Sequence, residues 1–106
     1  MTQIENIQSV KINIQATGFK MNEYLTRKIY NMVNKLKIIL PGVNWIDIYL
    51  KHTNEIARPR TVVVRFGKPG PDLVASDSGH RWKILLKNVE KRLIRKLEKR
   101  KAISLS

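Results

Sequence analysis

The sequence contains no cysteine, few acidic residues and no long hydrophobic stretch. Without cysteine, the chain can form neither a disulfide nor a thiolate-based zinc or iron–sulfur site. The longest apolar runs, such as residues 38–40, span about three residues, whereas a membrane helix needs about 20. The first six residues lack the basic and apolar regions of a signal peptide. We therefore expect a soluble, cytoplasmic protein.

The shortage of acidic residues leaves a strong positive charge. The 21 lysines and arginines are opposed by 8 aspartates and glutamates, which gives a net charge of +13. Such an excess destabilises a compact chain through self-repulsion, and a polyanionic partner relieves it. A basic surface that neutralises phosphates also releases condensed counterions, so nucleic acid is the first candidate partner. An anionic membrane surface is the second candidate.

The spacing of apolar residues predicts an α+β fold. Hydrophobic residues make up 42% of the 106 residues, enough for the core of one domain. Alternating apolar residues predict strands at about 10–16, 45–52, 60–66 and 73–76. Apolar residues three and four positions apart predict two helices. Asn22 is the expected N-cap of the first helix, and Asp77 or Ser78 that of the second.

The predicted order of elements is β-α-β-β-β-α. The first β-α-β unit should be parallel, and the following strands should form an antiparallel meander. Because each helix has one apolar stripe, we expect both helices to pack on one face of a four-stranded mixed sheet. Trp82 should anchor the second helix to the core. We expect a single domain over residues 1–106, with its core at about 10–101 and flexible ends.

The predicted second helix carries ten of the 21 basic residues, opposed only by Glu90 and Glu98. Like charges four positions apart cost helix stability, so a sequence selected for stability alone would interleave more acids. The pattern favours a phosphate-binding surface for structured RNA over an ordinary solvated helix face. The predicted RNA-binding residues are Arg27, Lys28, Lys35 and Lys37 on the first helix and Lys83, Lys87, Lys91, Arg92, Arg95, Lys96 and Lys99 on the second.

Trp45 and Tyr49 are predicted to lie on the sheet face opposite the helices. Exposed aromatic residues on a sheet can stack the bases of single-stranded nucleic acid. Packing across strands against Val63 is the alternative, and we favour it.

Catalytic and cofactor-binding patterns are not found in the sequence. Asp77, Ser78 and His80 are neighbours in the chain, which suits helix capping better than a catalytic triad assembled in space. Gly67-Lys68-Pro69-Gly70 is a turn signal without the spacing of a phosphate-binding loop. We expect no enzymatic activity, no cofactor, no metal ion and no small-molecule substrate.

Three segments carry a resemblance to a known family. They are Val10-Lys11-Ile12-Asn13-Ile14 leading to a helix that ends in Lys35-Leu36, Leu73-Val74-Ala75-Ser76, and Arg92-Leu93-Ile94-Arg95-Lys96-Leu97-Glu98-Lys99. In this order they resemble the ribosome hibernation-promoting factor family, also known as ribosome-associated inhibitor or sigma-54 modulation proteins. The last segment is similar to the family's Lys-Leu-x-Arg-Gln-Leu-x-Lys run. His80-Arg81-Trp82-Lys83-Ile84-Leu85-Leu86 departs from the family's acidic helix entrance, which is followed by Asp-Met-Tyr-Ala-Ala-Ile.

The resemblance implies a fold related to double-stranded RNA-binding domains. It also implies a translation inhibitor of the stress response that binds small-subunit rRNA through basic helices and blocks the mRNA and tRNA channel. Lys35, Arg92, Arg95 and Lys99 are the matched basic positions. We expect a short form without the extra C-terminal domain of the long members, monomeric when free. Two alternatives stay open: a regulatory protein-interaction module acting on a sigma factor, and a generic structured-RNA-binding domain.

Overall fold

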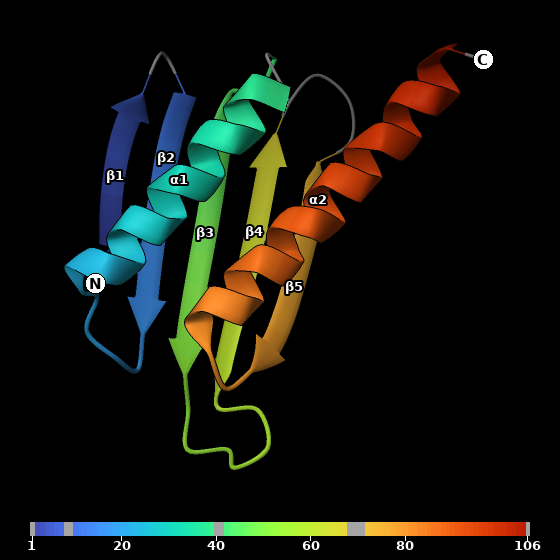
Figure 1. Ribbon diagram of the computed structural model, residues 1–106. Helices are drawn as coiled ribbons and strands as arrows, with labels where there is room; N and C mark the ends of the chain where they lie inside the picture. Colours follow the sequence, from blue (N-terminus) through green and yellow to red (C-terminus); the bar gives the residue numbers. More distant parts are fainter. Residues whose placement is uncertain (1, 8–9, 40–41, 68–71, 106) are drawn as a thin grey trace.

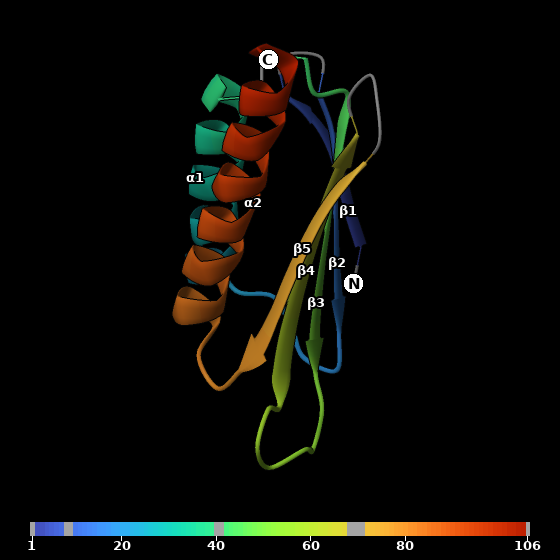
Figure 2. The same ribbon diagram turned by 90° about the vertical axis from the view of Figure 1, so that its right-hand side faces the viewer.

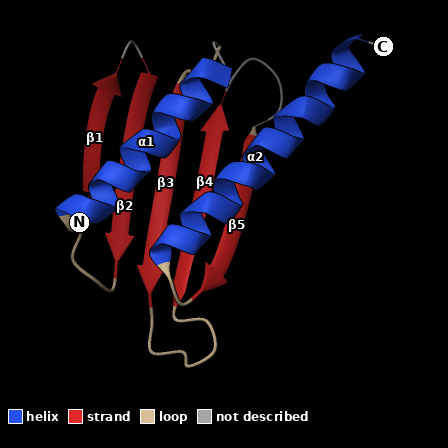
Figure 3. Ribbon diagram, in the orientation of Figure 1, coloured by secondary structure: helices blue, strands red, loops and turns tan. Residues whose placement is uncertain are grey.

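Two helices cover one face of a mixed sheet in the computed structural model, which describes residues 2–7, 10–39, 42–67 and 72–105 (Figure 1). The elements in chain order are β1 (Thr2–Ile7), β2 (Val10–Thr17), α1 (Glu23–Ile39), β3 (Trp45–His52), β4 (Arg60–Gly67), β5 (Leu73–Gly79) and α2 (Trp82–Leu105). The strands lie in the order β1-β2-β3-β4-β5. Figure 3, coloured by element type, shows α1 crossing β2 and β3 while α2 crosses β4 and β5. The predicted β-α-β-β-β-α order and the packing of both helices on one face are confirmed.

The core forms where the apolar side of the sheet meets the helices. β2 and β3 pair in parallel, and β3, β4 and β5 pair as an antiparallel meander, as predicted. Alternate residues of each central strand point to the helices, so Ile14, Ile48 and Val64 are at most 2% exposed. Leu25 and Leu93 contribute from the helices. Sheet and helices thus share a single hydrophobic core.

The connection from β2 to α1 requires a glycine. Gly18 has a φ of +83°, in the left-handed region that residues with a Cβ rarely adopt. A Cβ on Gly18 would also collide with the backbone carbonyl oxygen of His52. The chain therefore leaves β2 closely packed against the end of β3 before α1 begins.

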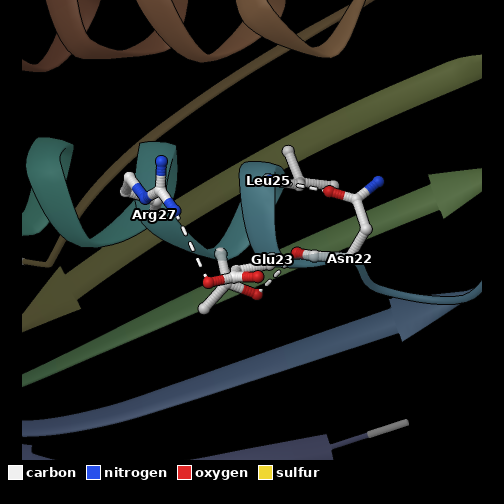
Figure 4. Close-up of polar contacts among 5 residues, drawn as sticks. Asn22, Glu23, Leu25 and Arg27 are labelled. Atoms are coloured by element: carbon white, nitrogen blue, oxygen red, sulfur yellow. Dashed lines mark hydrogen bonds and ion pairs between the residues drawn. The ribbon is translucent and has the colours of Figure 1, made fainter.

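Asn22 caps α1, as the sequence predicts. Its side-chain Oδ1 accepts a hydrogen bond of 2.7 Å from the backbone N–H of Leu25, which no helix carbonyl could satisfy (Figure 4). Glu23 adds a negative charge in the first turn, where the helix dipole is positive, and pairs with Arg27 at 3.5 Å. The helix ends at Ile39; Pro41, a residue that cannot continue a helix, lies outside the described residues.

Removing this cap should destabilise the protein. Asn22→Ala leaves the Leu25 N–H without its acceptor, which costs about 1 kcal/mol of unfolding free energy. For a domain of this size, we expect the melting temperature to fall by roughly 4–8 °C. Asn34→Ala, at an exposed mid-helix position, is the matched control and should not lower it. Thermal denaturation followed by circular dichroism measures both; equal melting temperatures for the two variants would contradict the capping role.

The sheet has a fifth strand beyond the four predicted. β1 pairs antiparallel with β2, from Thr2 opposite Gln15 to Ile7 opposite Val10. A flexible end was expected there, because residues 2–7 show no alternation of apolar and polar residues. An edge strand is joined to the sheet by its backbone hydrogen bonds and needs no such pattern. Backbone pairing therefore explains why this strand escapes prediction.

The start of α2 also differs from prediction. Asp77 and Ser78 do not cap the helix, because β5 continues to Gly79 by pairing with β4. Ser78 instead shares a hydroxyl–hydroxyl hydrogen bond of 2.9 Å with Thr61. The helix begins at Trp82, whose ring lies 4.8 Å from that of Phe19 against the core, as expected for an anchor. At its other end α2 is helical through Leu105, where a flexible tail was expected.

Candidate nucleic-acid interface

The exposed side of α2 carries a continuous row of cations. We call this row the cationic ridge; its members are Lys83, Lys87, Lys91, Arg95 and Lys99, all exposed. Residues four apart lie about 5–6 Å from each other between Cβ atoms, so the charges follow one another without a break. Each step of four residues turns 400°, which shifts the ridge by about 40° around the helix. It therefore begins beside α1 and ends beside β5.

The first part of the ridge borders a groove between the two helices. This inter-helix groove has a volume of about 190 Å³. It is lined by Lys28, Asn31, Lys35, Lys83, Leu86, Lys87 and Glu90. The groove thus joins four cations from both helices to one acid. Glu90, whose side chain is 16% exposed, pairs with Lys35 at 3.7 Å.

The last part of the ridge borders a larger groove between α2 and the sheet edge. This edge groove has a volume of about 350 Å³. It is lined by Val74, Ala75, Ser76, Arg92, Arg95, Lys96 and Lys99. Two of its cations are engaged with the outer strand: Arg92 donates to the carbonyl oxygen of Ser76, and Lys96 to that of Val74. The remaining two, Arg95 and Lys99, belong to the ridge.

Two of the eleven predicted RNA-binding residues lie apart from these surfaces. Arg27 is exposed but forms an ion pair with Glu23. Lys37 follows Lys35 by two residues and therefore points about 200° away around α1. The structure brings the other nine together along the ridge and the two grooves that flank it. We call the ridge and its two flanking grooves together the positive band; it covers the outer side of α2 and its border with α1.

The sequence did not reveal which cations have partners. Arg92 pairs with Asp77 at 3.5 Å as well as bonding to Ser76, and Asn88 donates to the same Asp77 carboxylate at 2.8 Å. These contacts join residues at least 11 positions apart on two elements, so no local spacing signals them. From the sequence, Glu90 stood out only as one of two acids on the second helix. Its ion-pair partner, Lys35, follows from the packing of α2 against α1.

Other kinds of site were also sought in the part of the chain that the structure describes. Within residues 2–7, 10–39, 42–67 and 72–105, no three histidine, aspartate or glutamate side chains gather where they could hold a metal ion. No helix in those ranges is both long and apolar enough to cross a membrane. The positive band, where nine cations gather, is a candidate functional surface of the described residues.

Comparisons with known proteins identify the fold. No family model matches the sequence, and no curated protein is similar enough to count as a match. Among solved structures, a ribosomal subunit interface protein from Coxiella burnetii matches 86% of this chain and 97% of its own, with a TM-score of 0.76 and 15% identity. The N-terminal domain of Protein Y from Thermus thermophilus matches 90% of this chain and 98% of its own, with a TM-score of 0.69 and 9% identity. The resemblance seen in the sequence is thus confirmed at the level of the fold: this chain has the α+β fold of a ribosomal subunit interface protein.

Proposed function

We propose that this protein is a cytoplasmic, ribosome-associated inhibitor of translation and not an enzyme. Its positive band docks on rRNA of the small subunit and blocks the channel for mRNA and tRNA. The observation that carries the proposal is the unbroken cationic ridge on α2, on a fold shared with a protein described as a ribosomal subunit interface protein. In this proposal the protein acts as a hibernation factor under stress and is monomeric when free.

The charge distribution supports a phosphate-rich partner. The ridge places like charges at successive four-residue spacings, an arrangement that costs a few tenths of a kcal/mol per pair in the free helix. Phosphates would relieve this repulsion and release their counterions. The two grooves beside the ridge also suit the backbone of folded RNA, which is recognised by shape and phosphate position.

Cosedimentation with purified ribosomal subunits tests the proposal. At low salt the protein should migrate with the small subunit in a sucrose gradient and stay at the top in its absence. An excess of an unrelated RNA duplex should not displace it. Protein that never leaves the top of the gradient would refute ribosome docking, and full displacement by the duplex would favour generic binding of structured RNA. A pull-down of a protein that survives nuclease and high salt would favour the regulatory protein-interaction alternative.

Removing the acid from the inter-helix groove should strengthen docking. Glu90→Gln keeps the size of the side chain and removes the one negative charge among the cations that line the groove. It also releases Lys35 from its 3.7 Å ion pair. A unit-charge pair at about 4 Å is worth about 1 kcal/mol in water, so we expect affinity for the small subunit to rise about fivefold. Fluorescence anisotropy of labelled protein measures this affinity. Glu98→Gln, exposed and outside the groove lining, is the matched control with the same charge change. Equal gains for both would indicate a general charge effect only.

A further inference from the structure

The sheet face opposite the helices is uncovered. Figure 2 shows both helices on one side of the sheet, with no described element on the other. Residues that alternate with the core positions of β2, β3 and β4 point to this open face. Its charged residues on these strands are Lys11, Lys51, Arg65 and Asp47, all exposed, so three cations stand against one carboxylate. The part of the open face formed by β2, β3 and β4 is therefore positive, independently of the band on α2.

A hollow of about 260 Å³ lies in the middle of the open face. It is lined by Asn13, Gln15, Asp47, Ile48, Tyr49, Val63 and Arg65. Tyr49 and Val63 are directly opposite each other in the β3–β4 register and give the hollow an aromatic and apolar surface. This confirms the pairing of Tyr49 with Val63 that the sequence favoured, yet the pair leaves a hollow beside it.

The polar groups of the hollow lack partners within the described chain. The side-chain Oδ1 of Asn13 is buried and accepts no hydrogen bond there. Asp47 and Arg65 are opposite each other on β3 and β4, and no ion pair within 4.0 Å joins them. An amide, a carboxylate and a guanidinium thus converge on one aromatic surface. These groups can donate to and accept from the edge of a nucleobase, as arginine does with guanine and carboxylates with amino groups.

A second aromatic residue lies farther along the same strand. The indole of Trp45 rests on Gly67, where a Cβ would collide with ring atoms Nε1 and Cε2. The sequence favoured packing on Val63 for this residue too, but the register places Trp45 opposite Gly67. Trp45 and Tyr49 are four residues apart on one face, about 13 Å along the strand. They can therefore contact separate bases of one extended strand.

We propose that the open face binds single-stranded RNA, with one base stacked on Tyr49 inside the hollow and its phosphates near Lys11, Lys51 and Arg65. The occupant follows from the combination of a flat aromatic surface, unpaired groups for a base edge and a surplus of cations for the backbone. The site is distinct from the ribosome-docking band, because the sheet separates the two. The protein then holds folded RNA on its helices and a single strand on its sheet.

Nuclear magnetic resonance of the full chain tests the proposal. The probe is a single-stranded seven-nucleotide RNA of mixed sequence, and the matched ligand is an oligomer of the same length without bases. The backbone amides of Asn13, Tyr49 and Val63 should shift with the RNA and not with the abasic oligomer. Shifts confined to α1 and α2, or identical shifts with both oligomers, would overturn the proposal.

Variants separate stacking from charge. Tyr49→Ala should weaken binding of the RNA by about 5- to 150-fold, the usual range for one stacked base, while Tyr49→Phe should keep most of it. Should Tyr49→Ala fail to fold, Arg65→Ala gives the second measurement, because the Arg65 side chain is exposed and has no ion pair with a described residue. It should weaken RNA binding more than Lys20→Ala, an exposed control outside the strands. Equal losses for these two, or none for Tyr49→Ala, would refute the site. If the ribosome-docking proposal were wrong, these expected effects on single-stranded RNA binding would not change, because the open face lies on the other side of the sheet.

Discussion

Reversing two charges of the cationic ridge, Lys91→Glu with Arg95→Glu, is expected to weaken binding to the small ribosomal subunit about a thousandfold at low salt. Each reversal removes an attraction of about 1 kcal/mol to a phosphate near 4 Å in water and adds a repulsion of similar size. The two sites together therefore change the binding free energy by about 4 kcal/mol. Both side chains are exposed and neither has an ion-pair partner among the described residues, so the fold should be unaffected. Equilibrium cosedimentation gives the dissociation constants.

A control with the same change in net charge is available. Lys20→Glu with Arg58→Glu also lowers the net charge by four, from +13 to +9, at exposed positions outside the helices and strands. This variant should lose much less affinity, because its charges lie outside the positive band. Equal losses for the two double variants would mean that overall charge, and not the ridge, drives binding. Unchanged binding of the ridge variant would exclude α2 as the contact surface.

The ridge could be predicted because it depends only on helix geometry. Apolar residues such as Leu93 and Leu97 must face the core, and every other position of the helix is then fixed at 100° per residue. Lys91 consequently has to lie on the exposed side. A strand with one buried face likewise alternates apolar and polar residues. This alternation predicts four strands, and the structure confirms all four.

What escaped prediction depends on contacts between distant elements. Asp77 and Ser78 are good helix caps by composition, but pairing with β4 draws them into a longer strand. The bonds from Arg92 and Lys96 to the β5 backbone require the position of α2 against that strand. No spacing within the helix encodes that position. Two of the four cations in the edge groove therefore have intramolecular partners that the sequence could not indicate.

These partners make the salt dependence of docking informative. Among the nine grouped cations, six have side chains with neither a hydrogen bond nor an ion pair to a described residue: Lys28, Lys83, Lys87, Lys91, Arg95 and Lys99. Lys28 does lie over the ring of Tyr24, 5.6 Å from its centroid. If each neutralises one phosphate, log Kd should rise against log salt with a slope of about 4 to 5. Affinity for the small subunit should then fall about a thousandfold between 50 and 200 mM salt.

A steeper slope would reveal a rearrangement on binding. If Lys35, Arg92 and Lys96 also leave their intramolecular partners for phosphates, nine neutralised phosphates predict a slope of about 6 to 8. Anisotropy titrations at five salt concentrations distinguish the two ranges, and Arg92→Ala separates them further. That substitution should not change the slope if Arg92 stays on the Ser76 carbonyl, and should lower it by about 0.7 to 0.9 if the arginine moves. A slope below about 2 would contradict phosphate docking altogether, because the six cations without an ion pair would then neutralise too few phosphates to release their counterions.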